Sequence, residues 1–196
     1  MTPEEFKNNW VKENNVLYPI SIERLVGLNL KQETIEFLNT AGLPDYAAPY
    51  LSFVKDTSDL YDGINRLSKQ YELIGEEFDR YIVIGSDGSG NPIALNTALD
   101  DKLEWLDHED YFSARYINES ILQFVEILLA YRGFVNQIIK ENGEDACLDS
   151  NFTDEQFKAL KDKIELIDNK AISEDGFWKE ELEMLITNRN DFLSEK

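Results

Sequence analysis

The feature that most constrains the fold is a run of apolar residues near the middle of the chain, Tyr-Ile-Val-Ile at positions 81–84. Because the run has no polar face, it is typical of an interior strand that is covered on both sides. Residues 87–92 are all turn-forming amino acids, so residues 93–95 are predicted to return as the hairpin partner. Gly85 and Gly88 are expected to have structural roles in this hairpin.

Two further strands are predicted after the hairpin. Leu103 and Trp105 alternate with charged neighbours, which is typical of a strand with one exposed face. Residues 111–117 are predicted to form a fourth strand, and residues 108–110 lie in the turn before it. The central residues therefore predict a meander, in which three or four consecutive strands pair in antiparallel order.

Helices are predicted on the N-terminal side of this sheet. Residues 2–5 and residues 29–32 each have the spacing of a capping box, in which two side chains satisfy the free amides of a helix N-terminus. Gly42 stands where a left-handed residue ends a helix, and Pro44 prevents the helix from continuing. Residues 55–79 are polar and predict a loop with helical pieces.

The longest helix is predicted to follow the meander, with Asn118 as its N-cap. Its apolar residues recur at helical spacing and form one stripe: Ile121, Phe124, Val125, Leu128, Val135 and Ile139. Arg132 falls on the same stripe, and a buried guanidinium must be paired. Either Arg132 overhangs the sheet edge and extends to water, or a buried salt bridge orders the helix against a loop.

The C-terminal region is predicted to be a helical extension over residues 143–196. Residues 153–156 have the spacing of a further capping box, and residues 177–186 have the pattern of an amphipathic helix. No composition shift in this region demands a second domain. The chain is therefore predicted to be a single domain over residues 1–196.

The residue types that many functional sites need are scarce. Cys147 and His108 are the only cysteine and the only histidine, which excludes an intramolecular disulfide, a cysteine zinc cage and a histidine metal cluster. Asp87, Ser89 and Asn91 alternate like part of a calcium loop, but no bidentate acid follows at the required spacing. We therefore expect no metal and no cofactor.

The segment over residues 84–90 is glycine-rich, but it leads into a strand, whereas a phosphate-binding loop leads into a helix. A hairpin turn is the better interpretation. Acid pairs such as Asp100-Asp101 or Glu109-Asp110 could act as a general acid and base. With 39 acids in the chain, such pairs are expected by chance, so no residue is predicted to be catalytic.

The chain is strongly acidic, with 39 Asp and Glu against 19 Lys and Arg and a formal net charge of −20. Phosphate groups repel such a chain, so direct binding to nucleic acid or to an anionic membrane is not expected. No run approaches the roughly 18 apolar residues that a membrane-spanning helix needs, and the acidic start lacks the features of a signal peptide. The charge indicates either solubility alone or a basic partner, and a cytoplasmic location is expected.

The most suggestive acids gather on the predicted central turns and the strand between them. These residues form a hypothetical partner-binding patch: Asp87, Asp100, Asp101, Glu104, Trp105, Asp107, Glu109 and Asp110. A negative patch with an aromatic anchor suits a basic protein, because complementary charge speeds encounter and aromatic residues contribute much of the binding energy. The alternative is that the aromatic residues face the core and the acids face water.

The central residues resemble the SUKH superfamily, in particular its bacterial immunity-protein branch. The resemblance rests on the order of four groups of residues: Gly42-Leu43-Pro44, residues 81–93, Leu106-Asp107-His108, and residues 116–124 with their Asn-x-Ser opening. It covers roughly residues 30–140, the predicted core of the domain. The resemblance implies an α+β fold with a mixed, mostly antiparallel central sheet flanked by helices.

The resemblance also implies a non-enzymatic function, the binding and neutralisation of a polymorphic toxin, often a nuclease, inside the producing bacterium. The expected partner is then a protein, namely a basic toxin domain. Two alternatives remain open. The chain could be a regulatory or scaffold protein that binds an endogenous partner, or a hydrolytic enzyme that uses one of the carboxylate pairs.

Overall fold

An antiparallel sheet forms the centre of the molecule, as the apolar run at 81–84 predicts. The computed structural model describes residues 1–13, 15–71, 75–173 and 176–194. Within these residues, seven strands form the main sheet in the order β3-β4-β6-β7-β8-β9, with β5 also paired to β6. Their bounds are β3 (Tyr46–Ala47), β4 (Leu51–Phe53), β5 (Asn65–Arg66), β6 (Tyr81–Ser86), β7 (Pro92–Asn96), β8 (Lys102–Asp107) and β9 (Ser113–Asn118).

Strands β6 to β9 form the predicted meander. All pairs between consecutive strands are antiparallel, for example Ile82 opposite Leu95 and Leu95 opposite Leu103. The fourth strand starts at Ser113 and not at Tyr111, because Tyr111 and Phe112 have positive φ angles and complete the turn. The turns before β7 and before β9 therefore lie at one end of the meander, and the turn before β8 lies at the other.

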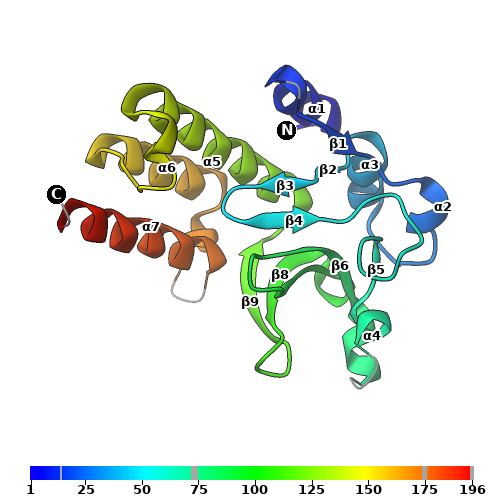
Figure 1. Cartoon of the computed structure of the whole chain (residues 1–196). Coiled ribbons are helices and arrows are strands. Elements are labelled where there is room, and N and C mark those ends of the chain that lie inside the picture. The colour runs from blue at the N-terminus through cyan, green and yellow to red at the C-terminus, as the bar shows by residue number, and fades with distance from the viewer. Residues whose placement is uncertain (14, 72–74, 174–175, 195–196) are drawn as a thin grey trace.

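Helices surround this sheet (Figure 1). Their bounds are α1 (Pro3–Trp10), α2 (Ile22–Leu25), α3 (Gln32–Thr40), α4 (Leu67–Gln70), α5 (Ile121–Asn142), α6 (Asp154–Ile167) and α7 (Phe177–Ser194). Short 3-10 helices occur at η1 (Val11–Glu13), η2 (Glu76–Arg80), η3 (Thr97–Leu99), η4 (Glu144–Ala146) and η5 (Asn169–Ile172), and β1 (Leu17–Tyr18) pairs with β2 (Leu43–Pro44). The architecture is α+β, as the resemblance implies.

Both faces of β6 are covered, which explains its apolar sequence. Ile82 and Ile84 belong to the main core, together with Phe124 of α5. Tyr81 and Val83 belong to a smaller cluster on the opposite face. The polar stretch at 55–79 covers this second face through Leu67 of α4, and its residues 72–74 lie outside the described residues.

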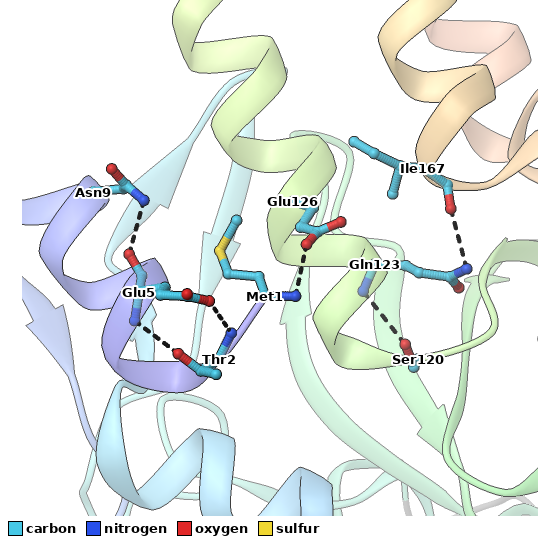
Figure 2. Close-up of polar contacts among 8 residues, drawn as sticks. All are labelled: Met1, Thr2, Glu5, Asn9, Ser120, Gln123, Glu126 and Ile167. Atoms are coloured by element: carbon cyan, nitrogen blue, oxygen red, sulfur yellow. Dashed lines mark hydrogen bonds and ion pairs between the residues drawn. The ribbon is translucent and has the colours of Figure 1, made fainter.

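The predicted capping boxes at residues 2–5 and 153–156 are both present. Thr2 accepts a hydrogen bond from the Glu5 amide, and the Glu5 carboxylate accepts one from the Thr2 amide (Figure 2). The amino group of Met1 lies 2.9 Å from Oε1 of Glu126 and so joins the start of α1 to α5. Nearer the start of α5, the side chain of Gln123 donates to the carbonyl of Ile167 and joins α5 to α6 (Figure 2).

The capping box predicted at residues 29–32 is absent. Asn29 has a φ of 62°, and Lys31 occupies the N-cap position of α3 without a capping side chain. The carboxylate of Asp101 accepts a hydrogen bond from the Lys31 amide at 2.6 Å instead. The start of α3 is therefore stabilised by a residue 70 positions away, which local spacing does not reveal.

The prediction that Asn118 caps α5 is wrong. Asn118 is the last residue of β9 and is fully buried, and Ser120 caps the helix by accepting from the amide of Gln123. The side chain of Asn118 donates to Asp168 and accepts from the indole of Trp178. Its role is to join the sheet to the C-terminal helices, because a buried amide must find partners for both its donor and its acceptor.

The C-terminal extension shares the main core. Trp178 is completely buried, and Leu160 and Ile164 of α6 belong to the same cluster. Asp168 also accepts a hydrogen bond from the hydroxyl of Tyr116 at 2.7 Å. Burial and this bond both raise the pKa of Tyr116, so the phenol stays protonated. The extension is thus joined to β9 by apolar packing and by a buried polar network.

Two other residues that the sequence singles out, Gly42 and Pro44, lie where the chain passes from α3 into β2. Gly42 has a φ of 69°, and a Cβ there would lie 2.1 Å from the carbonyl oxygen of Tyr18. Pro44 is part of β2.

On α5 the buried stripe passes through Phe134 and Ile138, whereas the expected Val135 and Ile139 are half-buried.

Arg132 of α5 is half-buried and contacts the end of α1. Its guanidinium donates to the carbonyl oxygens of Asn9 and Trp10 at 2.8 and 2.7 Å, and it lies 4.4 Å from the centroid of the Trp10 ring. These carbonyls belong to the last turn of α1, where backbone acceptors lack partners within the helix. Arg132 therefore joins α5 to the end of α1 through these backbone carbonyls.

Candidate partner-binding surface

The turn between β6 and β7 is built around the carboxylate of Asp87. This group accepts hydrogen bonds from the amides of Ser89 and Asn91, from the Asn91 side chain, and from the indole of Trp105. Burial raises the pKa of Asp87, but these four bonds outweigh it and leave the pKa below its ordinary value. The carboxylate is therefore ionised at neutral pH and fully engaged in holding the turn.

The same turn is joined to the turn between β8 and β9. His108 donates to the side-chain oxygen of Asn91 from its backbone amide at 3.2 Å and from its ring Nδ1 at 2.7 Å. Trp105 of β8 reaches Asp87 at 2.7 Å, and the guanidinium of Arg115 stacks over the Trp105 ring. We call residues 87–91 and 107–112 together the double-turn end of the sheet.

The outermost residues of the double-turn end are free. Glu109 and Asp110 are exposed and make no side-chain hydrogen bond or ion pair with any residue that the structure describes. The Tyr111 ring is 91% exposed, whereas its neighbour Phe112 is buried against Tyr71 and Phe78. The turn thus presents two carboxylates and one aromatic ring on a backbone that Phe112 anchors.

The other end of the meander differs, and we call residues 97–101 the single-turn end. Asp101 is buried and accepts from the Lys31 amide, and Asp100 is exposed with the Lys31 ammonium 3.9 Å away. Both acids therefore have intramolecular partners. A six-residue strand is about 20 Å long, which exceeds the Debye length of about 8 Å at physiological salt. The expected patch is therefore divided between two ends of the sheet.

The remaining acidic candidates, Glu104 and Asp107, lie on β8 and accept hydrogen bonds from nearby residues. Glu104 accepts from the Asn96 side chain at 2.7 Å, and Asp107 accepts from the Glu109 amide at 3.0 Å.

Gly85 allows β4 to approach, because a Cβ there would lie 2.3 Å from the carbonyl oxygen of Ser52. Gly88 faces the Tyr50 side chain, and a Cβ at Gly88 would lie 3.3 Å from the Cβ of Tyr50, which is tighter than an ordinary contact.

Sequence patterns missed the tyrosines of the β3–β4 hairpin and of the following loop. Tyr46, Tyr50 and Tyr61 are 72%, 77% and 67% exposed, although tyrosines in such numbers are ordinarily part of a core. Tyr46 and Tyr61 line a cleft of about 340 Å³ together with the acids Asp45 and Asp62. The local sequence carries no signal for this exposure.

No group of three or more His, Cys, Asp or Glu side chains in the described part of the chain is placed to hold a metal ion. No helix among the described residues is long and apolar enough to cross a membrane. The surface that combines exposed acids, exposed aromatic rings and a hydrogen-bonded backbone is the double-turn end with the neighbouring β3–β4 hairpin.

Comparison with known proteins identifies the family. The model of the SUKH-4 immunity protein family matches residues 17–184. The chain belongs to the SUKH-4 immunity protein family. The match extends on both sides of residues 30–140, where the sequence resemblance lies, and includes α6 and part of α7. Neither the curated proteins nor the solved structures gave a match.

Membership of the SUKH-4 immunity family implies a function in immunity to a toxin. Proteins of this kind are generally non-enzymatic. The arrangement at the double-turn end is compatible with a non-enzymatic function, because the carboxylates of Asp87 and Asp107 accept hydrogen bonds that hold the turns. Glu109 and Asp110 remain available for contacts with another protein.

Proposed function

We propose that this protein binds a cognate polymorphic toxin in the cytoplasm of the producing bacterium and neutralises it by occupying a basic surface of the toxin. The single observation that supports this most strongly is the double-turn end. There Glu109, Asp110 and Tyr111 are exposed on turns that the Asp87 and Asn91 hydrogen bonds hold in place.

The chemistry of this surface favours a basic partner. Unpaired carboxylates attract a positive protein surface over several ångströms and accelerate encounter. Tyr111 and the nearby Tyr50 supply large aromatic contact areas at a small cost in conformational entropy. A rigid turn loses little further entropy on binding, which improves affinity. A nuclease toxin, whose substrate is a polyanion, has the surface that these features fit.

The test is to identify a candidate toxin domain among the products of the neighbouring genes and to co-express it with this chain in a sensitive bacterial host. We expect the wild-type chain to rescue growth and to co-purify with the toxin at a fixed stoichiometry. Glu109→Lys with Asp110→Lys should abolish rescue at low expression levels. The matched control is Asp100→Lys, an equally exposed acid at the other end of the sheet, which should rescue like the wild type.

Two results would contradict the proposal. Rescue without any detectable complex would indicate a regulatory role, and rescue that survives reversal of Glu109 and Asp110 would remove the double-turn end from the interface. A non-toxic partner recovered in place of the toxin would favour the scaffold alternative.

A further inference from the structure

A second surface feature lies beside the double-turn end. The tip of the β3–β4 hairpin points toward the C-terminal helices (Figure 1), and between them is a pocket of about 250 Å³. Its walls are mostly apolar and come from the hairpin, from α5, from the segment after α5 and from α7. The residues that matter here are Tyr50, Tyr131, Phe134, Leu148, Glu181 and Met184.

Glu181 is the unusual member of this lining. It is the only Asp, Glu, Lys or Arg among the described residues that line the pocket, and it makes no hydrogen bond or ion pair with any described residue. Glu181 is half-buried, and this burial together with the nearby carboxylates of Asp87 and Glu180 raises its pKa to about 7. A carboxylate in an apolar wall without a cation is costly to keep.

Other acids of the same helix, α7, have cations as partners. Glu180 pairs with Arg115, and Glu183 lies 3.6 Å from the ammonium of Lys179. Glu181, one residue from Glu180, faces the pocket instead and has apolar side chains around it. An external cation with an aliphatic stem satisfies both parts of such a site, since the stem contacts the walls and the charge reaches the carboxylate.

We propose that this pocket receives a basic side chain of the toxin, with its aliphatic stem against Phe134 and Met184 and its charged end at Glu181. The inference rests on the proposed function and adds to it a second contact with the toxin. The two contacts are continuous on the surface, because Tyr50 borders the pocket and also lies against Gly88 of the double-turn end.

The pocket can be tested without the toxin. Met1 and Met184 are the only methionines, so a protein labelled with ¹³C in its methionine methyl groups gives two signals. Met184 lines the pocket, whereas Met1 lies against α5 near Glu126 and serves as an internal control. The probes are n-hexylammonium and hexan-1-ol, which share a stem and differ in charge.

Saturable shifts of the Met184 signal with hexylammonium, and an unmoved Met1 signal, are the expected result. Glu181→Gln should weaken hexylammonium binding at least about fivefold, because a contact with a charged group is lost. It should leave the binding of hexan-1-ol unchanged. The control Glu183→Gln removes an exposed acid on the same helix and should change neither.

The binding should also depend on pH. Burial raises the pKa of Tyr131 and of Cys147, so these groups on the walls stay neutral between pH 6 and pH 8, and Asp87 stays ionised. Among the described residues, Tyr50 also lines the site, the exposed Glu180 beside it is paired to Arg115, and the guanidinium of Arg189 lies over the ring of the lining residue Phe152. Hexylammonium should bind more tightly as the pH rises through about 7, because Glu181 then loses its proton.

Equal binding of the charged and neutral probes, or an unmoved Met184 signal, overturns the proposed chemistry of the pocket. With the purified toxin, the complex should shift the Met184 signal, and Glu181→Gln should weaken the complex about fivefold or more. Tight toxin binding with neither effect overturns this inference and leaves the proposed function standing. Absence of any toxin complex contradicts the proposed function, whatever the probes show.

Discussion

The two ends of the central meander both carry acids but use them differently. At the single-turn end, Asp101 is buried and accepts a hydrogen bond from the Lys31 amide, and Asp100 lies near the Lys31 ammonium. At the double-turn end, Asp87 holds the turn while Glu109 and Asp110 extend into water without partners. The difference shows that the availability of an acid depends on its intramolecular partners and not on its place in the sequence.

The largest effect is expected at the centre of the double-turn end. Asp87→Ala should lower the free energy of unfolding by about 3 kcal/mol, because four donors lose a charged acceptor and some stay buried. Urea unfolding monitored by Trp fluorescence measures this. Ser89→Ala, an exposed change in the same turn, should stay within about 0.5 kcal/mol of wild type.

This contribution of Asp87 should depend on pH with a defined sign. The pKa of Asp87 is lower in the folded protein than its ordinary value of about 4. Its stabilisation is therefore present above that value and is lost as the pH falls through the folded pKa. The difference between wild type and Asp87→Ala should shrink in acid, and a difference that grows there would contradict the hydrogen-bond network.

The next effect concerns the exposed aromatic ring. Tyr111→Ala should weaken the toxin complex about 30-fold, mainly through faster dissociation, because aromatic contacts dominate interface energy. The free energy of unfolding of the Tyr111→Ala variant should differ little from that of the wild type, since Tyr111 is 91% exposed. Surface plasmon resonance and urea unfolding together separate these outcomes. Lost stability with unchanged affinity would show that Tyr111 serves the fold.

A smaller effect should distinguish the two ends by charge. Glu109→Lys with Asp110→Lys should slow association about tenfold at low ionic strength, and 0.5 M salt should largely remove the difference. Asp100→Lys should slow association less than about twofold. Stopped-flow measurement of the association rate decides this. The double variant changes the charge by about four units and Asp100→Lys by about two, so equal slowing per unit of charge would mean that net charge alone steers the encounter.

The smallest effect is expected at the single-turn end. Asp101→Asn should lower the free energy of unfolding by about 1 kcal/mol, because the amide of Lys31 loses a charged acceptor at the start of α3. Asn keeps the left-handed backbone that this position adopts. Toxin association should be unaffected. Slower association in this variant would extend the interface to the end of the sheet that we exclude.

The sequence predicts the sheet well because its signals are local. The apolar run at 81–84 and the turn residues at 87–92 specify a hairpin, and the capping boxes at residues 2–5 and 153–156 mark two helix starts. The N-cap of α5 is predicted at Asn118 and not at Ser120, because Asn and Ser are both good N-caps. Asn118 instead bonds to Asp168 and Trp178, which lie at least 50 positions away in the sequence.

The surface is harder to predict because long-range contacts decide it. Asp100 and Asp110 are both acids in predicted turns, yet Lys31 lies near the first and no described residue pairs with the second. The sequence also gives no sign that Tyr46 and Tyr50 are exposed, and Glu181 is one of many acids in the printed sequence. Such features become visible only when distant segments are brought together.

Hydrogen exchange of the toxin complex tests the central claim most directly. Backbone amides in residues 87–91 and 107–112 should exchange more slowly in the complex than in the free protein, because the toxin covers the double-turn end. Amides in residues 97–101 should exchange at the same rate in both states. Slower exchange confined to residues 97–101, with none at the double-turn end, would contradict the claim.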